Sequence, residues 1–148
     1  MPPPFTLALL ESALNPPVDD PARYGLWHLP PAHPLVISPF DEQALEAALR
    51  IRDRLGAAVK ISALTLGPES ARSALKQALA LGADDAVHLL DAAFDGADGH
   101  VVAHALARTI TKLGGIDLVL AGRQAADWDA GIVGLGIAEI LDLPSVSF

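Results

Sequence analysis

The regular alternation of apolar runs with amphipathic segments most constrains the fold of this chain. Short runs with almost no polar residue are typical of strands that are buried on both faces. The predicted strands are Phe5–Leu10, Ala57–Gly67, Ala86–Leu90 and Ile116–Gly122. Segments with apolar residues at helical spacing begin at Ser38, at Pro68, at Asp98 or Gly99, and at Gly131. This order predicts an α/β fold, with a parallel sheet that helices cover on both faces.

Two further segments extend the predicted sheet. Pro144–Phe148 begins a fifth strand after the last helix, and Leu35–Ile37 is a candidate short strand. We therefore expect a Rossmann-like sheet of about five strands in a single domain over residues 1–148, a length sufficient for one core. The segment 11–34 holds six prolines without a helical period, which predicts a long loop.

The first predicted helix has a well-marked start. Ser38 suits the N-cap, Pro39 suits the first helical position, and Asp41 is expected near the positive end of the helix. In parallel sheets, ligands bind at the carboxyl ends of strands, where the strand order reverses. Besides this helix start, Thr65–Pro68 and Gly122–Gly134 follow predicted strands at that edge. We expect any small-molecule site to lie there.

Composition disfavours or excludes several classes of function. The formal net charge of −8 disfavours nucleic acid and anionic membranes as partners. The absence of cysteine excludes disulfides, zinc–thiolate sites and thiol catalysis on this chain. The N-terminal stretch MPPPFTLALL lacks the basic region of a signal peptide, and no apolar run is long enough to span a bilayer. We expect a cytoplasmic protein without membrane insertion.

The glycines in Gly131–Gly136 have two interpretations. At a helix start they let a phosphate approach exposed backbone N–H groups, where the helix dipole favours an anion. Alternatively they allow close helix–strand packing, with Asp129 as an ordinary N-cap. The spacing is not GxGxxG, so periodicity alone favours packing. Asp127 and Asp129 would repel a phosphate unless they cap the helix or face away, and Arg123 can pair with either carboxylate or with a phosphate.

The histidines do not indicate a catalytic centre. His100 and His104 are four residues apart, so both lie on one side of the predicted helix. A catalytic zinc has three protein ligands, and neither a third ligand nor the glutamate of HExxH is present, so a structural role is favoured. His88 is predicted to be structural within its strand. The chain has no GxxxxGK[ST], no GxSxG and no nucleophile–base set, and no catalysis by this chain alone is expected.

Three stretches resemble a known protein family. SPFDEQALEAALRIRD, LTLGPESARSALKQALALGADDAVHL and DLVLAGRQAADWDAGIVG are similar to the beta subunit of electron transfer flavoproteins, from about Pro39 to the end of the chain. The spacing of Gln124, Asp127, Asp129 and Gly134 is the most specific marker. The resemblance implies an adenine-nucleotide-binding α/β domain that holds AMP, or a second FAD in electron-bifurcating members. It also implies pairing with an alpha subunit to carry electrons from dehydrogenases, as a carrier rather than a catalyst.

The resemblance also implies which residues hold the nucleotide. They come from the first strand, the first helix start, the end of the second strand, and the loop before the last helix. These residues are Ala8, Ser38, Pro39, Phe40, Asp41, Leu66, Gly122, Arg123, Gln124, Ala125, Asp127, Asp129, Ala130, Gly131, Ile132, Val133 and Gly134. In the family the phosphates lie on backbone amides of the last segment, which is the helix start already considered as an anion site.

The chain departs from the family pattern at several positions. Ile132 and Val133 stand where the family usually has Gln followed by Thr, Val or Ser, and Ser38 replaces a common Asn. Backbone N–H groups remain whatever the side chain is. Family members continue well beyond Phe148, so we expect either a truncated subunit or a naturally short relative, with the C-terminal part of the family absent.

Two alternative functions remain open from the sequence. A degenerate site would leave a structural or interaction module that self-associates as a homo-oligomer, because open sheet edges and exposed aliphatic surface favour pairing. A universal-stress-like nucleotide-binding protein would have a similar sheet. Its usual Gly-rich phosphate loop followed by Ser or Thr is not present, so this alternative ranks last.

Overall fold

The chain folds into alternating strands and helices in the order that the sequence predicts. The structure, a computed structural model, describes residues 5–11, 36–56, 58–123 and 131–147, and the side chains of 5–11 are not described. The elements are β1 (Phe5–Glu11), α1 (Pro39–Leu55), β2 (Val59–Leu66), the short 3-10 helix η2 (Glu69–Ala71), α2 (Arg72–Leu81), β3 (Asp85–Leu89), the 3-10 helix η3 (Ala92–Phe94), α3 (Gly99–Leu113), β4 (Leu118–Ala121) and α4 (Val133–Ile140).

The four described strands form one parallel sheet in the order β3-β2-β1-β4. β1 lies in the middle of this order, with Ala8 opposite Ser62 on one side and Val119 on the other. The chain adds β2 and β3 on one side of β1 and then returns to add β4 on the other side. The strand order therefore reverses between β1 and β4. Open α/β sheets bind ligands outside the carboxyl ends of the strands at such a reversal, and we call this place the crevice.

The prediction of an α/β class with a parallel sheet is confirmed, but the described part of the chain has four strands rather than about five. Pro144–Ser147 forms no strand: Pro144 has no N–H to donate to a ladder, and Val146 is fully exposed. Val36 and Ile37 also form no strand, because the N–H of Ile37 donates to the side chain of Gln77 at 3.4 Å. The predicted loop 11–34 lies outside the described residues except Glu11, which ends β1.

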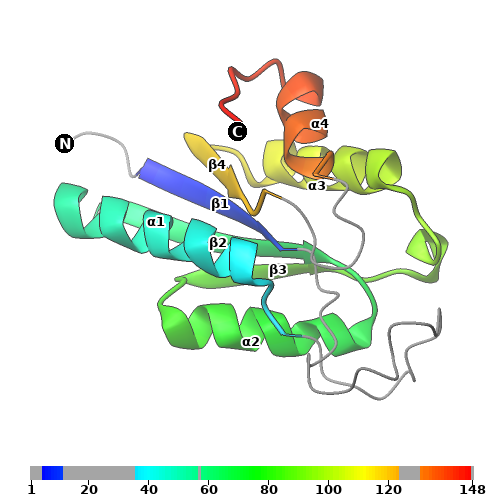
Figure 1. Ribbon diagram of the computed structural model, residues 1–148, viewed down its shortest axis with the longest axis horizontal. Helices are drawn as coiled ribbons and strands as arrows, with labels where there is room; N and C mark the ends of the chain where they lie inside the picture. Colours follow the sequence, from blue (N-terminus) through cyan, green and yellow to red (C-terminus); the bar gives the residue numbers. More distant parts are fainter. Residues whose placement is uncertain (1–4, 12–35, 57, 124–130, 148) are drawn as a thin grey trace.

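Helices cover both faces of the sheet (Figure 1). Alternate residues of β2 point to opposite faces, as the period of a strand requires. Ile61 and Ala63 are buried against α1 and α2, whereas Leu64 is buried against α3 and α4. β2 is thus buried on both faces, which explains its nearly unbroken apolar sequence.

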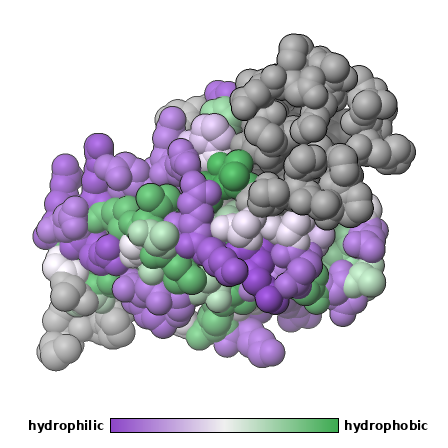
Figure 2. Space-filling model, turned by 90° about the horizontal axis from the view of Figure 1, so that it is seen from below, coloured by the Kyte–Doolittle hydropathy of each residue, from purple (hydrophilic) through white to green (hydrophobic). Residues whose placement is uncertain are grey.

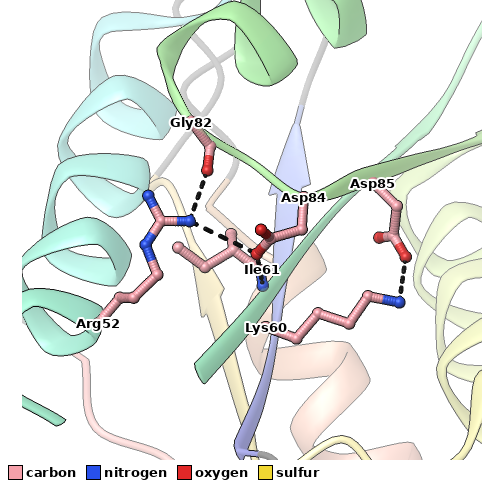
Figure 3. Close-up of polar contacts among 6 residues, drawn as sticks. All are labelled: Arg52, Lys60, Ile61, Gly82, Asp84 and Asp85. Atoms are coloured by element: carbon pink, nitrogen blue, oxygen red, sulfur yellow. Dashed lines mark hydrogen bonds and ion pairs between the residues drawn. The ribbon is translucent and has the colours of Figure 1, made fainter. Parts of the chain in front are cut away.

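A polar network fixes the amino-terminal end of β2 and β3, opposite the edge where ligands are expected (Figure 3). Arg52 of α1 donates to the carbonyl of Gly82 at 2.8 Å and lies 3.5 Å from the Asp84 carboxylate. The same carboxylate accepts from the buried N–H of Ile61 at 2.7 Å. These contacts tie α1 and the end of α2 to the amino-terminal end of β2.

Lys60 and Asp85 form an ion pair of 2.6 Å beside this network. Burial by itself raises the pKa of the Asp85 carboxyl. The hydrogen bond from Lys60, a hydrogen bond with Ser62 and the lysine charge outweigh burial, so the pKa lies below its ordinary value of 3.8. A lowered pKa in the folded state means that Asp85 stabilises the fold above the ordinary value. This contribution is lost as the pH falls through the folded-state pKa.

We predict that Asp85→Asn removes this dependence on acid. The gap in free energy of unfolding between the unsubstituted protein and the variant should be present at neutral pH and shrink as the pH falls below about 3.8. Denaturant unfolding at a series of pH values measures the gap. Lys60→Met is the matched control, since it removes the same pair from the other side. A gap that stays constant down to pH 2 would contradict the assignment.

Candidate site at the carboxyl ends of β1 and β4

The start of α1 lies at the reversal point of the sheet. Ser38 occupies the N-cap in an extended conformation, and its Oγ accepts from the N–H of Phe40 at 3.2 Å and of Asp41 at 3.4 Å. Pro39 occupies the first helical position, as predicted. Ser38 and Asp41 are both buried. The cap satisfies two N–H groups that a helix start would otherwise leave without a partner.

Asp41 joins this helix start to the segment that follows β4. Its Oδ1 accepts from the backbone N–H of Gly122 at 2.9 Å, across 81 residues of sequence. Asp41 is only 3% exposed, so the carboxylate is removed from water and depends on such contacts. A Cβ on Gly122 would lie 2.9 Å from both Cγ and the backbone N of Asp41, closer than real Cβ atoms approach. Position 122 therefore has to be glycine for the two segments to meet.

Arg123 follows immediately and lies over the ring of Phe40, with its guanidinium carbon 5.5 Å from the ring centroid. This distance is within the range of a cation–π contact. The predicted pairing of Arg123 with Asp127 or Asp129 involves residues outside the described ranges. The contact with Phe40 places a positive charge beside the crevice, where an anionic ligand group would gain from it.

The glycines of α4 serve close packing. A Cβ on Gly134 would lie 3.1 Å from Cβ of Ala121 in β4, and one on Gly136 would lie 2.9 Å from Cβ of Ala103 in α3. The interpretation of the glycine cluster as a packing device is therefore supported. Close packing depends on the missing Cβ atoms of these glycines, whereas an anion at the helix start would bind backbone N–H groups. The packing role therefore does not exclude an anion there.

The first turn of α4 differs from the prediction. The helix begins at Val133, and Ile132 rather than Asp129 occupies its N-cap. Ile132 has no side-chain oxygen, so it forms no capping hydrogen bond, and its side chain lies against Gly99 at the start of α3. The sequence suggested Asp129 because Asp is a preferred capping residue, but the helix starts three residues later than that choice required.

The structure brings together the described residues that the family resemblance selected. Ser38–Asp41, Gly122 and Arg123 meet through the contacts above, and Leu66 ends β2 next to β1 in the sheet. Ala8 lies in β1 opposite Val119. Gly131 and Ile132 precede the last helix, and Val133 and Gly134 are its first two residues. Gln124, Ala125, Asp127, Asp129 and Ala130 lie outside the described residues.

Sequence reasoning missed one polar contact at this edge of the sheet. His88 of β3 donates from Nε2 to the carbonyl of Gly67 at 3.0 Å, which ties the ends of β2 and β3 together. Its other ring nitrogen, Nδ1, is buried and has no hydrogen-bond partner among the described residues. The predicted structural role of His88 is supported. The sequence could not predict the Gly67 carbonyl as the partner of His88, because every residue has a backbone carbonyl.

A shallow groove elsewhere does not compete with this site. It has a volume of about 710 Å³ and runs between α1 and α2. Seen from below, the surface is mainly hydrophilic with smaller hydrophobic areas (Figure 2). Its lining comes from α1 and α2, with Glu42, Glu46 and Leu81 among its residues, and it reaches Pro39 at the start of α1 but includes neither Asp41 nor Gly122. No group of three metal-ligating side chains occurs in the part of the chain that the structure describes.

The sheet order, with its reversal between β1 and β4, defines a doubly wound α/β fold, a class that binds ligands at the carboxyl ends of its strands. A family model described as the electron transfer flavoprotein domain matches residues 28–148. The chain belongs to this electron transfer flavoprotein domain family. Within the described ranges, no helix is long and apolar enough to cross a membrane.

Similar proteins include several beta-type subunits. Electron transfer flavoprotein subunit beta of Thermoanaerobacterium thermosaccharolyticum is 47% identical over 115 residues, which is 78% of this chain and 43% of that protein. The corresponding subunit of Clostridium acetobutylicum is 48% identical with the same coverage. Subunit CarD of the caffeyl-CoA reductase-Etf complex of Acetobacterium woodii is 44% identical and is covered over 44% of its length. The chain thus spans less than half the length of these relatives.

We predict that Asp41→Ala destabilises the fold by about 1.5–3 kcal/mol, because it removes a charged acceptor and leaves the partly buried N–H of Gly122 without this partner. Asp41→Asn is the matched control, since its amide oxygen can still accept from Gly122 and the loss should be smaller. Gly122→Ala should also destabilise, through the overlap with Asp41. Denaturant unfolding measures all three variants. Equal stability of the alanine and asparagine variants would argue against the hydrogen bond.

Proposed function

We propose that this chain is the nucleotide-binding domain of an electron transfer flavoprotein beta-type subunit. The membership of the family and the 47% identity to a protein named as such a subunit support this function. In this proposal residues 1–148 form a single domain that acts in the cytoplasm. It pairs with an alpha-type subunit and takes part in electron transfer as a carrier instead of catalysing a reaction by itself.

The observation that carries the proposal is the hydrogen bond between Asp41 and the N–H of Gly122. This contact joins the start of α1 to the first residue after β4, at the strand reversal between β1 and β4. A nucleotide in the crevice would lie against Ser38–Asp41, Leu66 and the residues that follow Gly122. Of these, Ser38–Asp41 lie at the start of α1 and Leu66 lies at the end of β2.

The proposed phosphate position is the start of α4. Gly131 has a positive φ of 59°, a conformation that glycine adopts without strain, and it turns the chain into the helix. Ile132 and Val133 offer no side-chain donors, so anion binding here rests on backbone N–H groups and the helix dipole. Arg123 beside the crevice supplies a compensating positive charge. The ligand proposed on these grounds is AMP or FAD.

We predict that the purified protein releases AMP or a flavin when it is denatured, and that the ligand-free protein gains thermal stability when AMP or FAD is added. A ligand at a hundred times its Kd would contribute about 2.7 kcal/mol to the free energy of unfolding. Chromatography of the denatured protein and a thermal-shift titration measure the two effects. Arg123→Ala should weaken binding, and Arg72→Ala, at an exposed Arg72–Glu69 ion pair, is the matched control. If the denatured protein releases neither AMP nor a flavin, and neither AMP nor FAD stabilises the ligand-free protein, the nucleotide proposal is overturned.

A second candidate function is self-association, which one observation favours. β4 pairs only with β1 among the described strands, so its other edge has no partner there. Leu135 and Leu143, in and just after α4, are each more than two-fifths exposed. An apolar strand with an unpaired edge is a common site of strand addition between chains.

This candidate predicts that the protein is dimeric or larger in solution, with a mass that rises with concentration. Sedimentation velocity at several concentrations measures the state. Leu118→Lys, which places a charge on the edge strand, should shift the equilibrium toward the monomer. Lys76→Glu on α2 is a control for the added change in charge. A strictly monomeric protein at all concentrations would exclude the candidate.

A further inference from the structure

Two histidines on α3 are positioned as a pair. The rings of His100 and His104 contact each other edge to face, with centroids 4.7 Å apart and an interplanar angle of 81°. Both residues are exposed. Beyond this ring contact, neither side chain forms a hydrogen bond or ion pair with the described residues. Their nitrogens are therefore available to a ligand from solvent.

The helix beneath them keeps the pair in place. Asp98 caps α3 by accepting from the N–H of Val101 at 2.9 Å. On the opposite side, Ala103, Leu106 and Ala107 are buried against the sheet and α4. Residues four apart on a helix are neighbours on its surface, so the folded chain brings the two imidazoles within reach of one ion. An unfolded chain does not hold them together.

We propose that His100 and His104 form a two-ligand surface site for a divalent late transition metal, namely Cu²⁺, Ni²⁺ or Zn²⁺. Neutral imidazole is a preferred ligand of these ions, whereas Mg²⁺ and Ca²⁺ prefer oxygen. Because the described part of the chain offers no third metal-ligating group here, water completes the coordination. Cu²⁺ binds most tightly of the three, as the order of stabilities for such ligands requires.

The surroundings determine the strength of the site. Arg108 lies four residues beyond His104 on the same exposed side of α3, and its positive charge opposes a bound cation. The negative net charge of the chain acts in the opposite direction. Two nitrogen ligands and a nearby arginine give a weak site. It exists independently of the nucleotide crevice, so its test does not depend on the proposed function.

The test uses the full chain with His28→Gln and His33→Gln, because these two histidines lie outside the described residues and their imidazoles would compete for the added metal. Calorimetric titration with CuCl₂, NiCl₂ and ZnCl₂ in a non-chelating buffer should give one site per chain, with no binding of MgCl₂. Either His100→Gln or His104→Gln should weaken Cu²⁺ binding by about tenfold or more, since each removes one of two metal bonds. Arg108→Gln should strengthen it.

A thermal-shift titration provides the second measurement. Cu²⁺ should raise the midpoint of unfolding of the background protein, because the ion binds the folded helix better than the unfolded chain. The rise should vanish in both single-histidine variants. Cu²⁺ affinity that is unchanged by His100→Gln and His104→Gln, or no binding up to millimolar metal, would overturn the proposal.

Discussion

The hydrogen bond from the N–H of Gly122 to the buried Asp41 carboxylate is the contact on which the arrangement of the crevice depends. It links the first helix start to the segment that leaves β4, beside the contact of Arg123 with the Phe40 ring. A buried carboxylate is costly unless it is hydrogen-bonded, so this contact cannot be lost without a structural response. The position of the chain after β4 is consequently set by the position of α1, and both are set by the order of the strands.

Local sequence signals predicted most of the fold. Ser38 and Pro39 marked the start of α1, and Gly56 and Gly82 marked the ends of α1 and α2. These signals are local, because a capping residue interacts with backbone groups that are close to it in the sequence. The apolar runs located the four strands to within a few residues. The fifth strand was wrong, since an apolar pattern near Pro144 does not provide a neighbouring strand with which to pair.

The contacts within the site were less accessible to sequence reasoning. Asp41 was expected to interact with the dipole of its own helix, and its partner 81 residues away leaves no local pattern. The same applies to Arg123, because its contact with the Phe40 ring corresponds to no sequence motif. The family resemblance selected these residues together, but their geometry comes from the meeting of two distant chain segments at the strand reversal.

The small residues beneath α4 have a consequence for how this domain can change over evolution. Gly134 lies against Ala121, where a Cβ would be a tight fit, and Gly136 lies against Ala103, where a Cβ would come closer than real Cβ atoms do. A larger side chain at either glycine would push the whole helix outward and carry its first amides away from the crevice. Packing contacts in the interior thereby determine the position and direction of the backbone N–H groups at the start of α4. Evolutionary change at the start of α4 is thus limited by interior contacts such as that of Gly136 with Ala103.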